Sequence, residues 1–232
     1  MRIWTLSGAT LLLSLALNPL AGQNVSLDEG TFRISLNGER VGTEDFTISR
    51  VGMGSEARVI LRGTVELSMD GGELTLAPAM DARGPALGVA TYQIKASGTE
   101  TTEIYVGLNG ARYQSRTISA QGEQLREFRG GQGSVLLDRD VAHQHYLLTP
   151  HLDDSAAVSL NVLTPRDSRQ LRMTLTFVGT EEVRVGDALY STRHFRLDGG
   201  EDARDIWFDE QGRVLKVEIP SLGYLAERED LS

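Results

Sequence analysis

The sequence contains no cysteine. This absence excludes thiol catalysis, iron–sulfur clusters, cysteine-ligated zinc and disulfides. It also excludes a lipid attached to an N-terminal cysteine, so we expect a protein that is not lipid-anchored. A mature chain of about 210 residues is long enough to bury a sizeable core without disulfides.

Lysine is scarce. Lys95 and Lys216 are the only lysines, and 32 acidic residues against 23 basic ones give a formal net charge of −9. No segment is rich in Lys or Arg, so the electrostatic footprint of a nucleic-acid-binding protein is missing. A basic face for anionic lipid headgroups is missing too. We expect no nucleic-acid partner.

Long hydrophobic runs are confined to the start of the chain. Arg2 is followed by a Leu/Ala-rich run over residues 9–17 and then by the small residues Ala21 and Gly22. A basic start, a short apolar stretch and a small-residue exit are typical of an export signal, and the run is too short for a comfortable membrane span. We therefore expect residues 1–22 to be a signal peptide. The mature protein is then soluble, periplasmic or secreted, and without an integral membrane span.

Alternation of apolar and polar residues dominates the rest of the chain. Val59, Leu61, Val65 and Leu67 share one face of a segment whose intervening residues are mostly polar. Residues 32–36, 158–162, 171–177 and 215–219 alternate in the same way. This period is that of strands with one buried and one solvated face. With frequent Gly turns between the runs, it predicts about eleven to thirteen strands in an all-β antiparallel curled sheet, half-barrel or barrel, as a single domain over residues 24–226.

Residues 139–149 depart from this alternation. Val141, His145 and Leu148 lie at helical spacing. Asp138 and Asp140 are suitable N-caps, and Pro150 is expected to end the segment. We predict one short helix here. The charged tail, residues 227–232, is expected to be frayed.

Three histidines are the candidate metal ligands. His143, His145 and His151 lie close together in the sequence. On a strand, residues two apart point to the same face, whereas on a helix they point about 200° apart. Because a helix is predicted, we favour an interpretation without metal, without other cofactors and without a catalytic set. A metal-dependent enzyme built on these three residues is kept as a less favoured alternative.

Aromatic residues make up only 6% of the chain. Tyr105, Phe195 and Trp207 fall in predicted strands or at their ends, where core packing is the ordinary role of such side chains. The alternative is that they line a cavity inside the curled sheet. On that hypothesis they are the ligand-binding residues.

Two stretches carry a resemblance to a known group of proteins. The start of the domain, FRISLNGERVGTE from Phe32, and its end, IWFDEQGRVLKVEIP from Ile206, resemble the opening and closing hairpins of exported bacterial β-rich proteins of unknown function. The closing pattern is W-x-D-x-x-G-R-x-x-K-x-E, running from Trp207 to Glu218. The resemblance implies a curled antiparallel sheet, similar in shape to periplasmic lipoprotein carriers. It implies no catalytic residues.

These observations lead to a ranked set of functional hypotheses. The first is an exported, non-catalytic cell-envelope protein that binds a lipid or another apolar or amphiphilic ligand in a concave β-sheet. The alternative is a structural or partner-binding envelope module with a filled core, which works through an exposed patch or a free edge strand.

Overall fold

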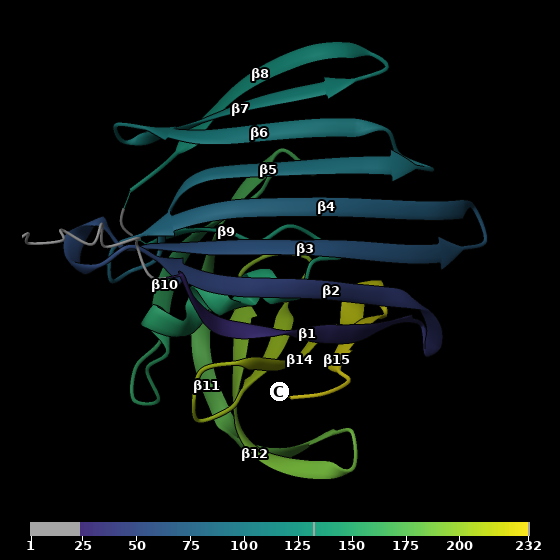
Figure 1. The fold of residues 1–232 in the computed structure, drawn as a ribbon, viewed down its shortest axis with the longest axis vertical. Coiled ribbons are helices and arrows are strands. Elements are labelled where there is room, and N and C mark those ends of the chain that lie inside the picture. Colours follow the sequence, from purple (N-terminus) through teal and green to yellow (C-terminus); the bar gives the residue numbers. More distant parts are fainter. Residues whose placement is uncertain (1–23, 132, 232) are drawn as a thin grey trace, which may run out of the picture.

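The computed structural model of the 232-residue chain describes residues 24–131 and 133–231. The expected signal peptide, residues 1–22, lies outside the described residues. The described chain forms one 15-stranded sheet that curls into a nearly closed barrel (Figure 1). The prediction of an all-β curled sheet with one short helix is confirmed, although the strands are more numerous than the expected eleven to thirteen.

The strands follow one another with short connections. The first eight are β1 (Asn24–Leu36), β2 (Glu39–Val51), β3 (Arg58–Met69), β4 (Gly72–Arg83), β5 (Gly88–Gly98), β6 (Thr102–Asn109), β7 (Arg112–Ser119) and β8 (Gly122–Arg129). The other seven are β9 (Ser134–Leu136), β10 (Val158–Thr164), β11 (Arg169–Val185), β12 (Ala188–Asp198), β13 (Arg204–Phe208), β14 (Val214–Ile219) and β15 (Tyr224–Arg228). The described part of the chain also contains three 3₁₀ helices: η1 (Gly54–Glu56), η2 (His143–His151) and η3 (Pro220–Leu222). No helix in the described ranges is long and apolar enough to cross a membrane.

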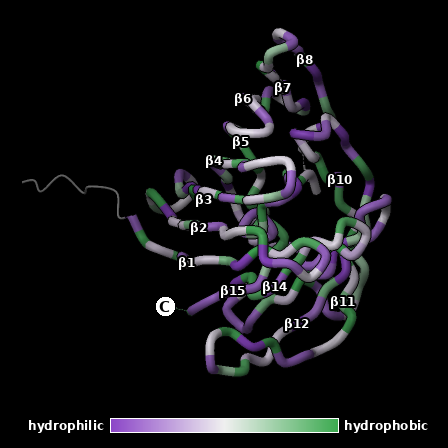
Figure 2. Tube along the Cα trace, turned by 90° about the vertical axis from the view of Figure 1, so that its right-hand side faces the viewer, coloured by the Kyte–Doolittle hydropathy of each residue, from purple (hydrophilic) through white to green (hydrophobic). Residues whose placement is uncertain are grey.

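Two meanders share the sheet. Neighbouring strands are antiparallel, apart from the short parallel pair β9–β10. The pairing of β1 with β15 joins the meander β1–β8 to the meander β9–β15, and β8 and β9 are left as the two edges. In Figures 1 and 2 the two meanders face each other, and η2 contacts both β3 and β14. The sheet is therefore wrapped around the helix.

The interior is a continuous apolar core. Val59, Leu61, Val65 and Leu67 are all buried, as their alternation predicts. The largest side chains buried there include Phe32, Tyr92, Tyr113, Phe195, Phe208 and Tyr224. Each fully buried side chain of this size contributes about 1.5–3 kcal/mol to the free energy of unfolding. This filling leaves the polar face of each strand on the outside of the barrel.

Local sequence accounts for the hairpins at both ends of the domain. Asn37 and Gly38 both adopt positive φ, 51° and 84°, which is what a two-residue hairpin turn requires. In the closing hairpin, Asp209 accepts hydrogen bonds from the backbone N–H groups of Gln211 and Arg213 (3.0 and 2.8 Å), and Gly212 takes φ 79°.

The helix differs from the prediction in type and limits. It is a 3₁₀ helix over His143–His151, so Pro150 lies inside it rather than ending it. Asp140 has φ 63° and neither predicted aspartate caps the helix, whose N-cap position is Ala142. The cap comes from a distant strand, as described below, and no local pattern reports such a contact.

The C-terminal tail also differs from the prediction. Expected to fray from Glu227, it instead runs in β15 as far as Arg228, which is buried. The Arg228 guanidinium contacts both carboxylate oxygens of Asp28 (3.1 and 2.9 Å), and Glu229 N–H donates to the carbonyl of Thr31 (2.9 Å). The charges that suggested fraying are therefore paired across the β1–β15 seam.

Candidate functional site

The structure separates the three aromatic residues predicted to bind a ligand. Phe195 packs in the interior against Phe177 and Phe208. Trp207 points from the opposite face of the sheet into a second cluster, formed with Val183, Val185 and Leu215. Tyr105 is half-buried on the outer face of β6, where its hydroxyl donates to Glu103 (3.0 Å). The three side chains thus line no common cavity.

Trp207 belongs to a polar stack on the outside of the second meander. Its ring stacks on the ring of His194, with the two centroids 4.3 Å apart. The Lys216 ammonium group lies over the Trp207 ring, 4.3 Å from its centroid. The indole N–H donates to Glu181 (2.9 Å), and this bond, followed by the one from His194, lowers the pKa of the Glu181 carboxyl. The stack secures the long β11–β12 hairpin against β13.

The two buried candidate metal ligands, His143 and His145, have separate partners. The His143 ring contacts Glu44, and His145 Nδ1 lies 2.9 Å from the carbonyl of Ala142. Burial lowers the pKa of His145 to about 3 and also lowers the pKa of the half-buried His151. No group of three or more His, Asp or Glu side chains in the described ranges is arranged to hold a metal ion.

Glu44 fixes the helix inside the barrel. It is fully buried on β2, and its carboxylate accepts the backbone N–H groups of Ala142 and His143 (2.6 and 3.1 Å) as well as contacting the His143 ring. That ring stacks on Phe46 (5.6 Å, 3°) and lies over Gly63, where a Cβ would approach within 2.8 Å. Side chains and helix thus occupy the interior that was predicted to hold an apolar ligand.

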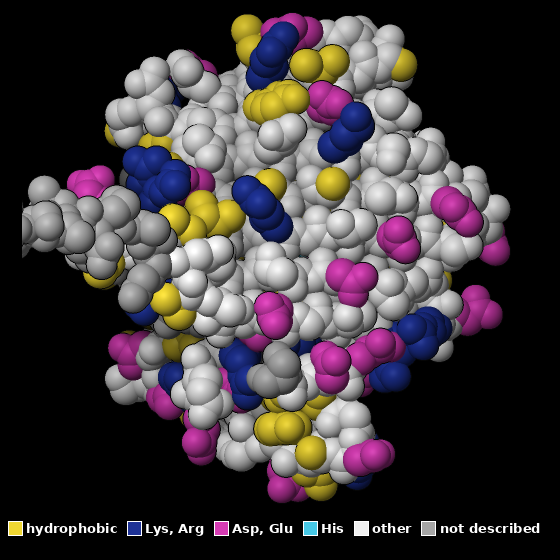
Figure 3. All heavy atoms as spheres, in the orientation of Figure 1, with side chains coloured by type: hydrophobic (Ala, Val, Ile, Leu, Met, Phe, Trp, Pro, Cys, Tyr) yellow, Lys and Arg dark blue, Asp and Glu magenta, His cyan; other side chains and the backbone are white. Residues whose placement is uncertain are grey.

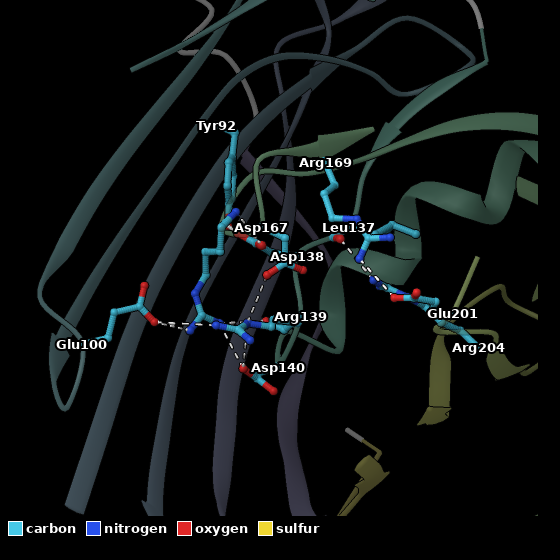
Figure 4. Close-up of polar contacts among 11 residues, drawn as sticks. Tyr92, Glu100, Leu137, Asp138, Arg139, Asp140, Asp167, Arg169, Glu201 and Arg204 are labelled. Atoms are coloured by element: carbon cyan, nitrogen blue, oxygen red, sulfur yellow. Dashed lines mark hydrogen bonds and ion pairs between the residues drawn. The ribbon is translucent and has the colours of Figure 1, made fainter. Parts of the chain in front are cut away.

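A second buried polar group lies at one end of the barrel, drawn in Figure 4. Asp138 accepts the hydroxyl proton of Tyr92 (2.9 Å) and the backbone N–H of Arg166 (3.1 Å), while its own N–H donates to Gln144 (2.8 Å). Burial raises the pKa of the Asp138 carboxyl to about 6, against the opposing charge of Arg166. These bonds hold the loop before η2 against the wall of the sheet.

Two broad hollows lie on the outer face of the first meander, which faces the viewer in Figure 3. One, of about 720 Å³, extends over β3–β7, and a second, of about 610 Å³, extends over β1–β4. Small side chains at Ala77, Ala79 and Gly107 leave this space, and Ile60 and Tyr105 contribute apolar surface. We call the two hollows together the outer cleft.

Strand register arranges the outer cleft as a row of side chains. Arg62, Ala79, Gln93, Tyr105 and Arg116 are successive cross-strand partners from β3 to β7. With neighbouring strands about 4.8 Å apart, the row is roughly 19 Å long. The row therefore places Ala79, Gln93 and Tyr105 between two guanidinium groups.

Arg62 lies where the two hollows of the outer cleft meet, since it lines both. It is exposed and has no ion pair with any residue in the described ranges, whereas Arg116 is held by both oxygens of Glu123 (2.9 Å each). In Figure 3 basic and hydrophobic side chains gather over the left and upper part of this face, and acidic ones lie more to the right. The cleft thus offers a free cation beside apolar surface.

Sequence reasoning identified Tyr105 but missed Arg62 and Ile60. Arg62 and Ile60 lie on the solvated face of β3, whose other face is apolar. Residues at such positions are ordinarily exposed to solvent and have no specific function. One feature of the sequence could have indicated the hollow, namely the two small residues Ala77 and Ala79 on the same face of the next strand. Only the register places that pair beside Arg62.

Comparison with known proteins supports the fold alone. No family model matches the chain, and no curated protein matches its sequence. A solved structure described as a beta-barrel-like protein of a domain of unknown function (DUF1849) from Brucella abortus is similar, with a TM-score of 0.51 and 11% identity. The similarity covers 90% of this chain and 98% of that one. The chain is thus similar in fold to a β-barrel-like protein of unknown function.

Proposed function

We propose that this chain is an exported, non-catalytic envelope protein that binds a single-chain amphiphile with an anionic head in the outer cleft. The observation that carries the proposal is the unpaired Arg62 beside Ile60 and Ala79. The export part of the proposal is supported by the leader-like sequence of residues 1–22.

The chemistry of the cleft selects the ligand class. A guanidinium favours a carboxylate or phosphate group, with which it forms paired hydrogen bonds. Next to it, Ala79 and Tyr105 offer apolar surface for a chain lying across the strands. The cleft is open to solvent, so we expect modest affinity that weakens as salt screens the charge.

Titration with dodecanoate below its micelle concentration tests the proposal, followed by the amide NMR signals of β3–β6. We expect saturable shifts at Arg62, Ala79 and Tyr105. Arg62→Glu should weaken binding by about tenfold or more, because it replaces attraction by repulsion. Arg172→Glu, on the outer face of β11, is the matched control and should leave binding unchanged.

Two matched ligands separate the contributions of head and chain. Acetate, which lacks the chain, and dodecyltrimethylammonium, which has the opposite charge, should both bind more weakly than dodecanoate. Equal binding of the cationic amphiphile, or unchanged binding by Arg62→Glu, would show that the proposal is wrong.

The filled interior also favours a second candidate, a module that adds a partner's strand at its free edge. β8 is the end of the sheet, and Leu125 on it is 73% exposed. In a hairpin closed by a two-residue turn, the Leu125–Arg116 pair is not hydrogen-bonded, so the Leu125 N–H points away from β7. Leu125→Pro would block an added strand while leaving the β7–β8 ladder intact. A partner captured equally well by this variant would exclude edge pairing.

A further inference from the structure

A small cavity at one end of the barrel gathers three arginines. It measures about 30 Å³ and is lined by Arg139, Arg169 and Arg204, together with Asp167 and Asp202. Leu171, Met173 and Leu222 form its apolar wall. It is separate from the outer cleft, with which it shares no lining residue.

Arg204 is buried there, with only 4% of its surface exposed. One guanidinium nitrogen lies 3.3 Å from His145 Nε2. Another donates to the carbonyl of Leu137 (3.3 Å), as drawn in Figure 4. Its Nε has no hydrogen-bond partner among the described residues. No carboxylate in the described ranges lies within ion-pair distance of this guanidinium.

Both partners of Arg204 are neutral. His145 Nδ1 faces the carbonyl of Ala142, which can only accept, so Nδ1 carries the ring proton and Nε2 accepts from Arg204. Since burial holds the pKa of His145 near 3, this ring is uncharged at neutral pH. A buried charge without a counter-charge is costly, which is why such groups in proteins are nearly always paired.

The other two arginines are only loosely held. Arg139 lies 3.5 Å from Asp167, and Arg169 lies 3.7 Å from Glu201, whose side chain is 85% exposed. Neither guanidinium makes a hydrogen bond to a described residue. These two arginines each have a carboxylate within 4 Å, so the positive charge at the cavity that lacks an adjacent counter-charge is that of Arg204.

We propose that the cavity formed by Arg139, Arg169 and Arg204 binds one small anion, of a size between chloride and a carboxylate group. Its volume exceeds the roughly 10–15 Å³ that one water needs and is too small for a bulky ligand. A bound water would satisfy the free N–H of Arg204 but would leave the charge uncompensated. An anion satisfies both.

Chloride NMR line widths test the site on the whole chain. Chloride in exchange with a bound site gives excess broadening, which we expect for the unmodified protein. Arg169→Gln should weaken binding by about tenfold, because it removes one of the charged donors. Arg172→Gln, an exposed arginine of the same strand, should bind as the unmodified protein does.

Arg204→Gln should reduce anion binding more than Arg169→Gln does. If this substitution of a buried residue prevents folding, Arg169→Gln still tests the proposal. Loss of the broadening on adding formate supports a carboxylate-sized occupant, and persistence of the broadening supports a halide alone. Crystals soaked in bromide should show an anomalous peak in the cavity of the unmodified protein but not of Arg169→Gln. No broadening in the unmodified protein, or equal broadening in Arg169→Gln and Arg172→Gln, would overturn the proposal.

Discussion

Glu44 and His143, 99 residues apart in the sequence, meet inside the barrel, where the Glu44 carboxylate accepts the His143 backbone N–H (3.1 Å). The carboxylate takes the place that a local N-cap residue would have at η2. Because negative charge is favourable at a helix N-terminus, this contact both orients the helix and fixes β2 to it. The barrel and its filling are thus stabilised by the same group.

We predict that Glu44→Gln destabilises the protein by about 2–3 kcal/mol, since hydrogen bonds to a charged group are replaced by weaker ones inside the core. Urea unfolding followed by tryptophan fluorescence measures the change. Glu66→Gln, exposed on the adjacent strand β3, is the control and should change the free energy of unfolding little. Equal effects of the two substitutions would contradict the structural role of Glu44.

We predict that Gly63→Ala destabilises the protein by about 1–3 kcal/mol, because the added methyl group overpacks the core. The new Cβ would lie 2.8 Å from the His143 ring, which Phe46 and Glu44 prevent from moving aside. Gly107→Ala has open space around the new Cβ and should stabilise by about 0.5 kcal/mol. Thermal unfolding of both variants checks the difference in sign.

Asp138 is expected to make stability depend on pH. Burial raises its folded-state pKa to about 6, above the ordinary aspartate pKa of 3.8, so the folded protein keeps a proton that the unfolded chain releases. Its contribution to the free energy of unfolding is therefore complete below about pH 4 and falls by about 3 kcal/mol as the pH rises to about 6. The stability difference between the unmodified protein and Asp138→Asn should follow this fall.

Urea titrations at several pH values give that difference directly. Asp70→Asn, in an exposed turn, should show a difference that stays flat over the same range. A flat difference for Asp138→Asn as well would show that the carboxyl titrates normally in the folded protein.

Arg228→Gln is predicted to cost about 3–5 kcal/mol, because it leaves the buried carboxylate of Asp28 without its charge partner. Arg40→Gln removes a surface pair with Glu229 and should cost about 0.5 kcal/mol or less. Chemical denaturation of the two variants, each lacking one arginine near the β1–β15 seam, measures the contrast. Similar values would mean that the tail contributes little to stability.

The candidate sites were only partly predictable. Tyr105 was identified from the sequence, yet as a residue of the interior, whereas it lies on the outer face of β6. Strand alternation separates the residues of a strand into two faces, and the apolar residues show which face is buried. A tyrosine is compatible with either face, so its position could not be assigned. The role of Arg204 could not be predicted from the sequence. Its lack of a counter-charge depends on which residues surround it in the folded barrel.

The sequence by itself determined the strands, their buried faces and the turns, as in Val59–Leu67 and Asn37-Gly38, because backbone sterics and period-2 alternation act over a few residues. Only the tertiary structure decided that η2 is a 3₁₀ helix capped by Glu44, and that Arg62 and Arg204 have no charge partners in the described chain. Electrostatic pairing depends on distance in space and on burial, and closure of the sheet sets both between residues far apart in the chain.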